Sequence, residues 1–143
     1  EVMIEAFMQG TEITCGCYKT KDKEVVFPIT EVVTSNEFFD YDAKYNGQVQ
    51  EITPARLNED TARRVAELTS HIYDILHCNG IIRIDYIICR GLNKDGEEVD
   101  KIYMLEVNTT PGMTATSFIP QQVKAAGLNM ADVLTEIVEN QFK

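Results

Sequence analysis

A polar connection between two apolar segments constrains the fold of this chain more than any other feature. Residues 81–89 and about 101–107 are apolar enough to be buried strands, and Asp95-Gly96 lies between them. Asp-Gly between segments of this kind favours a β-hairpin closed by a two-residue turn. We therefore predict that the two segments pair as neighbouring antiparallel strands.

The register of this hairpin brings four polar side chains to one face. With a two-residue turn Asp85 lies opposite Glu106 and Arg83 opposite Asn108, and a shift by two residues keeps the shared face. Two carboxylates directly opposite each other repel by about 1 kcal/mol unless a cation lies between them. Oxygen donors without histidine or thiolate favour Mg²⁺ or Mn²⁺ over zinc. The sequence therefore predicts a metal site at Asp85, Glu106 and Asn108.

Arg83 extends this prediction to phosphate chemistry. An arginine beside such a site can neutralise a developing oxyanion or bind phosphate through two parallel hydrogen bonds. The strand that carries Glu106 then runs into a loop around Pro111-Gly112, where the glycine lets the backbone approach a ligand. The alternative is a purely structural network of salt bridges among Arg83, Asp85 and Glu106.

Composition excludes several other classes of protein. The chain has 143 residues, 44% of them hydrophobic, which suits a single domain spanning residues 1–143. Its net charge of −10 argues against a nucleic-acid partner, which would need a basic face. No apolar run approaches the ~20 residues that a membrane span requires, so we expect no membrane partner.

The cysteines indicate a reducing compartment. Cys15, Cys17, Cys78 and Cys89 form no C-x-x-C pair and no dense framework, which fits reduced thiols and a cytoplasmic protein. Cys15-Gly16-Cys17 would suit a metal clip only with further ligands at matching spacing. The simpler interpretation is a pair of strand residues that point the same way.

Periodicity predicts strands at residues 2–7, 12–19, 24–33 and 47–53, the third with Pro28 at an edge or a bulge. Asn58 is expected to cap a helix that ends at Gly80, and Asn129 to cap the last helix. A shorter helix is expected at residues 121–126. The chain begins in an expected strand without an initiator methionine, so we expect a fragment of a longer protein.

Five motifs along the chain resemble those of one enzyme family. Arg83-Ile84-Asp85, the segment 106–114 and Ser117-Phe118-Ile119-Pro120 are similar to the carboxy-terminal part of D-alanine–D-alanine ligases, members of the ATP-grasp superfamily. The stretch from Glu5 to Glu12 resembles the hinge of that family, and residues 39–45 resemble its mobile active-site loop. The resemblance extends along essentially the whole chain.

The resemblance implies an α+β fold, a largely antiparallel sheet flanked by helices that forms the larger carboxy-terminal subdomain of an ATP-grasp enzyme. The residues implied in ATP binding are Glu5, Phe7, Met8, Glu12 and Lys44. Those implied in holding two Mg²⁺ or Mn²⁺ ions are Asp85, Glu106 and Asn108. The residues implied in catalysis are Arg83, Gly112, Tyr45 and Ser117, and those implied in binding substrate are Ser117 and Phe118.

The implied reaction makes a D-Ala-D-Ala dipeptide for peptidoglycan. One D-alanine carboxylate attacks the γ-phosphate of ATP to give an acyl phosphate, and the amine of a second D-alanine displaces the phosphate. Arg83 and the Gly112 amide would stabilise the tetrahedral oxyanion, and Ser117 with the Phe118 amide would bind the acceptor carboxylate. Tyr45 favours the dipeptide over a D-lactate product. The resemblance also implies a homodimeric parent enzyme.

Two alternatives stay open. The first is another ATP-grasp ligase that joins a carboxylate to a different amine, or to D-lactate. The second is a metal-dependent binding module without catalysis, in which the carboxylates serve structure alone. The family builds its ATP cleft with a lid and an amino-terminal domain that these residues lack, so we expect the fragment alone to be inactive.

Overall fold

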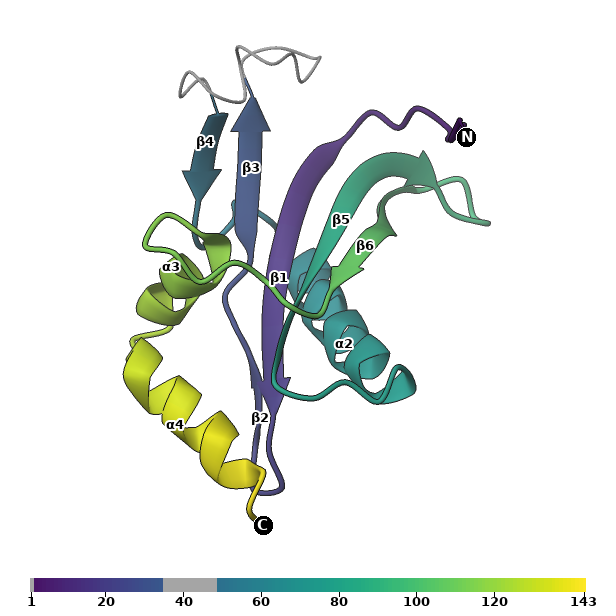
Figure 1. The fold of residues 1–143 in the computed structure, drawn as a ribbon. Helices are drawn as coiled ribbons and strands as arrows, with labels where there is room; N and C mark the ends of the chain where they lie inside the picture. Colours follow the sequence, from purple (N-terminus) through teal and green to yellow (C-terminus); the bar gives the residue numbers. More distant parts are fainter. Residues whose placement is uncertain (1, 35–48) are drawn as a thin grey trace.

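A six-stranded antiparallel sheet forms the centre of the molecule, and helices cover both of its faces (Figure 1). The computed structural model describes residues 2–34 and 49–143. The elements are β1 (Thr11–Lys19), β2 (Glu24–Val26), β3 (Thr30–Thr34), β4 (Val49–Ile52), α2 (Glu59–Ile75), β5 (Ile81–Leu92), β6 (Glu98–Asn108), α3 (Phe118–Ala125) and α4 (Met130–Asn140). The strands lie in the order β4-β3-β1-β5-β6, with β2 also paired to β1. The predicted α+β class is confirmed.

Strand alternation divides the core between the two faces of the sheet. Cys15 and Cys17 of β1 are buried in a cluster with Val65 and Tyr73 of α2. Tyr18, on the opposite face of β1, is buried in a second cluster formed with α3 and α4. Burial raises the pKa of both thiols to about 12, so they stay protonated and are poor zinc ligands. This fits core residues of a strand.

Two of the predicted strands differ from the structure. The stretch predicted as one strand over 24–33 is split into β2 and β3, because the chain bends away from β1 at residues 27–29, around Pro28. The strand predicted at 2–7 is wrong, because residues 2–9 have no regular structure and Ile4 is 91% exposed. An apolar stretch becomes a strand only where a neighbour pairs with it, and this one has none among the described residues.

The β5–β6 hairpin reaches the predicted register by a different route. Asn93 N–H donates to Glu97 O, so the loop has three residues, 94–96, rather than two. This loop aligns Tyr86 with Met104, but Leu105 bulges out, and beyond it Asp85 pairs with Glu106 and Arg83 with Asn108. The bulge therefore restores the pairs that a two-residue turn would have given.

Helix α2 begins where the sequence predicts and ends earlier. The Asn58 side chain accepts a hydrogen bond from Thr61 N–H, as expected of a cap. The helix ends at Ile75, and His77 rather than Gly80 takes the first left-handed conformation, with φ 52°. His77 N–H and Cys78 N–H close the end by donating to Asp74 O and Tyr73 O, the hydrogen bonds of a Schellman motif.

Replacing His77 with glycine is expected to stabilise the fold by about 0.5–1 kcal/mol, because glycine adopts positive φ without a steric cost. Urea unfolding of the two proteins measures the difference. The matched control is Gly80→Ala, since Gly80 has φ 74° and its added Cβ would meet only Ile137 Cγ2, at 3.9 Å. That variant should lose about 1 kcal/mol. A loss of stability in His77→Gly would contradict the explanation.

Asp100 ties the hairpin to the start of α2. Its carboxylate accepts hydrogen bonds from Thr61 Oγ1 at 2.7 Å, Arg90 Nη1 at 3.1 Å and Asn58 Nδ2 at 3.2 Å. The Arg64 guanidinium also donates to the Asp100 backbone carbonyl, at 2.7 Å. The hydrogen bond from Thr61 is the main cause that lowers the pKa of Asp100. Asp100 thus stabilises the contact of α2 with β6 in its charged form.

Replacing Asp100 with asparagine is expected to lower the free energy of unfolding by about 1–2 kcal/mol at neutral pH. Because the folded pKa is lowered, the stabilisation is complete above the unfolded pKa, near 4, and is lost as the pH falls through the folded value. Urea unfolding at successive pH values should show the two proteins converging below about pH 4. Asp95→Asn, at the exposed tip of the hairpin, is the control. A difference that stays constant with pH would refute this explanation.

Candidate active site

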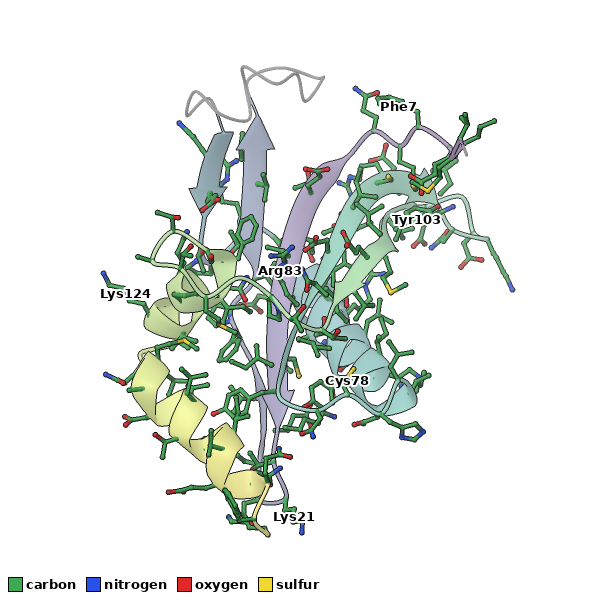
Figure 2. The ribbon with its side chains drawn as sticks, viewed as in Figure 1. Phe7, Lys21, Cys78, Arg83, Tyr103 and Lys124 are labelled. Carbon is green, nitrogen blue, oxygen red and sulfur yellow. The ribbon has the colours of Figure 1, made fainter. Side chains whose placement is uncertain are left out.

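The face of the sheet beside α3 carries two rows of polar residues across β1, β5 and β6. The first row is Thr14, Asp85 and Glu106, which are Cα partners in adjacent strands. The second row is Gly16, Arg83 and Asn108. Cα partners project to the same face of a sheet, so the pairing places the four residues predicted from the hairpin together. Figure 2 shows Arg83 in the middle of this face, next to α3.

Arg83 is held from two sides. Its Nε and Nη2 donate to the two carboxylate oxygens of Asp85, at 3.0 and 3.2 Å. Its Cζ also lies 5.1 Å from the centre of the Phe118 ring, at the first turn of α3. The Arg83 side chain is only 16% exposed, and the cation–π contact together with the two-point ion pair leaves it little rotational freedom. A guanidinium fixed in this way is suited to stabilising negative charge.

Thr14 is a contact of Asp85 that the sequence interpretation missed. Its Oγ1 donates to Asp85 Oδ1 at 2.7 Å, so Asp85 is oriented by Thr14 on one side and by Arg83 on the other. Strand alternation in the sequence could have identified this residue. Thr14 is two residues beyond Glu12, and both therefore project from the same face of β1.

Glu106 differs from Asp85 in being exposed and, among the described residues, in having no ion-pair partner. It pairs directly with Asp85 across the ladder, an arrangement of like charges that a cation would stabilise. Asn108 Oδ1, next along β6, accepts a hydrogen bond from Thr110 N–H at 3.1 Å. Two carboxylates and an amide oxygen on one face suit Mg²⁺ or Mn²⁺ by donor type. No cluster of three or more His, Cys, Asp or Glu suited to a metal occurs in residues 2–34 and 49–143.

Glu12 adds a third acid to this face. Burial, followed by the negative charge of Asp85, raises its pKa. The effect of the Asp85 charge on this pKa indicates that the Glu12 carboxylate, projecting from β1, lies near the same polar face. A carboxylate in this position can accept hydrogen bonds from a pair of hydroxyl groups at the edge of the site.

The loop after β6 packs against the start of α3. Ser117 Oγ accepts a hydrogen bond from Thr114 N–H at 3.1 Å and lies 2.7 Å from Thr114 Oγ1. A Cβ on Gly112 would lie 2.9 Å from Ser117 Oγ, so a side chain at Gly112 would require the Ser117 hydroxyl or the loop to shift. The first turn of α3, which begins at Phe118, contains no acidic residue. No side chain caps this turn, and Pro120 in it has no N–H, so the N–H groups of Phe118 and Ile119 form the place where an anion can bind.

The other predicted site residues are not brought to this face by the described structure. Glu5, Phe7 and Met8 lie in the irregular segment before β1, where Phe7 is 77% exposed. Figure 2 shows Phe7 on this segment, well away from Arg83. Lys44 and Tyr45 lie outside the described residues.

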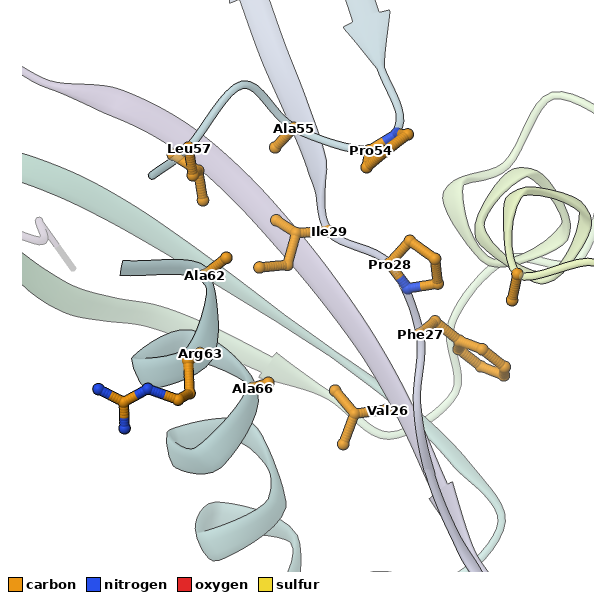
Figure 3. Close-up of a pocket in the computed structure, with 11 residues that line it drawn as sticks. Val26, Phe27, Pro28, Ile29, Pro54, Ala55, Leu57, Ala62, Arg63 and Ala66 are labelled. Atoms are coloured by element: carbon orange, nitrogen blue, oxygen red, sulfur yellow. The ribbon is translucent and has the colours of Figure 1, made fainter. Parts of the chain in front are cut away.

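A pocket of about 530 Å³ lies elsewhere, between α2 and the segments around Pro28 and Pro54 (Figure 3). Its lining is mostly apolar and includes Ile29, Leu57 and Ala66. None of the predicted site residues lines it. In the described ranges, no helix has the length and apolar composition to cross a membrane.

Comparison with known proteins agrees with this arrangement. The family described as "D-ala D-ala ligase C-terminus" matches residues 1–139. The chain is 73% identical over 142 residues to a D-alanine–D-alanine ligase of Phocaeicola vulgatus and 72% identical over 142 residues to one of Bacteroides fragilis. Each alignment covers 99% of this chain and 41% of the relative, so the chain spans about two fifths of the length of these relatives.

Solved structures show the same similarity. A D-alanine–D-alanine ligase from Bacillus anthracis superposes with a TM-score of 0.70 at 33% identity, covering 96% of this chain and 42% of that one. The structure of that enzyme complexed with ATP gives a TM-score of 0.66 at 33% identity, over 95% and 41% of the two chains. The VanG D-Ala:D-Ser ligase from Enterococcus faecalis gives 0.66 at 30% identity, over 93% and 36%. The chain therefore belongs to the family of D-alanine–D-alanine ligase carboxy-terminal domains.

Proposed function

We propose that this chain is the carboxy-terminal catalytic part of an ATP-dependent D-alanine–D-alanine ligase, and that residues 1–143 form one domain of it. The observation that carries the proposal is the polar face itself. There the fixed Arg83–Asp85 pair lies between Glu106 on one side and the start of α3 on the other. Family membership supports the same assignment.

ATP and the metal ions would be bound along the edge of this face. Asp85, Glu106 and Asn108 would hold two Mg²⁺ or Mn²⁺ ions, which would screen the repulsion between the carboxylate and the γ-phosphate. Glu12 would accept hydrogen bonds from the ribose hydroxyls. The remaining residues that we assign to ATP binding are Glu5, Phe7, Met8 and Lys44. The ATP complex of the Bacillus anthracis enzyme supports the choice of nucleotide.

The second half of the reaction would use Arg83 and the loop after β6. Attack of the acceptor amine on the acyl phosphate places negative charge on the carbonyl oxygen. The Arg83 guanidinium and the Gly112 N–H would stabilise this charge, because both are fixed before the reaction begins. Ser117 and the Phe118 N–H would hold the acceptor carboxylate at the start of α3. Tyr45 would help to close the active-site loop.

The product would be the D-Ala-D-Ala dipeptide used in peptidoglycan. Because the reaction consumes ATP and free D-alanine, we place the enzyme in the cytoplasm. We further propose that the full-length enzyme is a homodimer.

A second acceptor is favoured by one observation. The similarity to the VanG D-Ala:D-Ser ligase, at 30% identity, is close to that of the Bacillus anthracis D-alanine–D-alanine ligase. D-serine is therefore the second candidate for the acceptor. Its side chain differs from that of D-alanine by a single added oxygen atom, so the two acceptors differ little in size.

Phosphate release by the full-length enzyme tests the proposal. The assay contains ATP, Mg²⁺ and D-alanine alone, or D-alanine with D-serine or D-lactate, and the products are identified by mass spectrometry. We expect D-Ala-D-Ala to be the main product and L-alanine to give none. A predominant D-Ala-D-Ser product would select the second candidate. Absence of phosphate release with every acceptor would reject a ligase function.

A further inference from the structure

Gln122 is a polar side chain in the core of the molecule. It lies on α3 and is 0% exposed. Its Oε1 accepts a hydrogen bond from Gly16 N–H at 2.9 Å, and its Nε2 donates to Thr14 O at 3.1 Å. Nε2 also donates to Thr30 Oγ1 at 3.1 Å. The amide is thus fully used, and all of these contacts are made with the sheet.

These contacts fill a gap in the pairing of β1. On one edge, β1 pairs with β3 along Glu12–Thr14 and with β2 along Cys17–Lys19. Between them the neighbouring chain bends away, and the only strand-like contact there in the described structure is Phe27 N–H to Gly16 O. A side-chain amide has the donor and acceptor of a peptide group, and buried backbone groups need partners. Gln122 therefore takes the place of the missing peptide.

Helix α3 can reach β1 because Gly16 has no side chain. A Cβ at Gly16 would lie 2.4 Å from Ile119 Cδ1 and 2.9 Å from Gln122 Oε1. Helix α3 thus packs directly against β1, and the hydrogen bonds of the Gln122 amide fix the distance and the orientation of the helix relative to the strand.

Thr14 of β1 also connects Gln122 to the polar face. Thr14, which receives the Gln122 hydrogen bond at its carbonyl, donates through its side chain to Asp85. Asp85 binds Arg83, and Arg83 stacks on Phe118 at the start of α3. The contacts form a closed ring from α3 through the sheet and back to α3.

We propose that Gln122 is a positioning residue for the acceptor: by fixing α3 on β1, it sets the place of Ser117 and the Phe118 N–H relative to Arg83 and Asp85. The acceptor role of Ser117 and Phe118 rests on the proposed function. Gln122 is five positions after Ser117, roughly 7 Å along a helix axis. A small change of tilt at Gln122 is therefore transmitted to the helix start.

The test uses Gln122→Met in the full-length enzyme. Methionine keeps the size of the side chain but cannot make the three hydrogen bonds. Because D-alanine is both donor and acceptor, the initial rate is fitted to two D-alanine binding steps. We expect the KM of the acceptor step to rise about tenfold, with the KM of the donor step and the KM for ATP changed less than about twofold. The Arg83 Nε–H resonance, observed after ¹⁵Nε-arginine labelling, should also move as the Phe118 ring shifts.

Val123→Ala is the matched control. Val123 follows Gln122 on α3 and is 1% exposed, but it packs in the apolar cluster rather than on the backbone of β1. We expect this variant to lower the Tm while leaving the acceptor KM and the Arg83 resonance unchanged. Thr30→Val is the milder second variant, since it removes one of the three hydrogen bonds of Gln122, together with the hydrogen bond between Thr30 Oγ1 and Thr53 Oγ1 at 2.6 Å. It should raise the acceptor KM about threefold and carries the test if Gln122→Met does not fold.

The positioning role is overturned if the variants at Gln122 and Thr30 leave both the acceptor KM and the Arg83 resonance unchanged. It is also overturned if Val123→Ala raises the acceptor KM as much as Gln122→Met, because Gln122 would then serve stability alone. A wild-type enzyme that forms no D-alanine product overturns the proposed function instead. In that case the Arg83 resonance still decides whether Gln122 positions α3.

Discussion

Replacing Glu106 with glutamine in the full-length protein is expected to lower turnover about 10³-fold. Each 1.4 kcal/mol of lost transition-state stabilisation costs a factor of ten, and the metal that we propose at Glu106 would supply several kcal/mol. Glutamine keeps the shape of the side chain and removes its charge. The exposed position of Glu106 on β6 means that folding should hardly change. Phosphate release and thermal unfolding, measured on the same preparations, separate the two effects.

The control for this variant is Glu98→Gln. Glu98 also lies on β6 and is exposed, but it pairs with Leu92 near the hairpin tip. The charge change is identical, and turnover should stay within about twofold. For Glu106→Gln the Mg²⁺ concentration that gives half-maximal activity should also rise. Unchanged turnover would favour the binding module over the enzyme.

Replacing Arg83 with methionine is expected to lower kcat by about 10² to 10³, the usual cost of losing one fixed donor to an oxyanion. Arg83→Lys should recover only part of this loss, because an ammonium group cannot reproduce the two-point contact with Asp85 or the stacking on Phe118. The KM for ATP should change much less than kcat, as expected for a contact made mainly in the transition state.

Arg90→Met controls for the loss of an arginine from β5. Arg90 lies further along the same strand and also pairs with an aspartate, Asp100, at 3.1 Å. Its side chain is 67% exposed, whereas that of Arg83 is 16% exposed. This variant should lose some stability and keep its turnover. Equal losses of kcat in the two variants would show that Arg83 acts through stability and not on the reaction.

The sequence predicted correctly that Asp85 and Glu106 share a face, but in the structure this result depends on two departures from the expected register that compensate each other. Asp85 and Glu106 had to share a face in any register shifted by an even number of residues. The turn itself was predicted wrongly, as two residues rather than three, and the bulge at Leu105 cancelled the error. Nothing in a short apolar stretch indicates which residue will bulge.

The remaining differences depend on distant contacts. The strand expected at residues 2–7 would need a neighbour that the described residues do not supply. Helix α3 begins at Phe118, three residues before the expected start at Gln121, and Ser117 at its N-cap bonds back to Thr114 in the loop rather than to the helix. Gln122 could have been suspected as a polar residue between Ile119 and Val123, yet its partners on β1 are more than 100 positions away in sequence.

The early end of α2 has a local cause that the position of Gly80 in the sequence does not indicate. Gly80 is the residue that usually ends a helix, and it does have a positive φ of 74°. The chain nevertheless leaves the helix at His77, where the hydrogen bonds of His77 N–H and Cys78 N–H close the end, and Tyr73 Oη donates to Gly80 O at 2.7 Å in the turn that follows. These contacts all lie within the same turn region, so local hydrogen bonds accompany the end of the helix before Gly80.

The bulge at Leu105 also determines where β6 tolerates a change in length. Tyr86 pairs with Met104 and Asp85 with Glu106, so Leu105 has no partner on β5. Deleting that single residue would leave every pair on both sides in register, and Glu106 would still face Asp85. Deleting a paired residue of β6 between the tip and the bulge would instead shift one part of the hairpin by one position and reverse its faces. β6 can therefore lose a residue without a change of register at one position, Leu105. This position is adjacent to Glu106, on which the proposed chemistry depends.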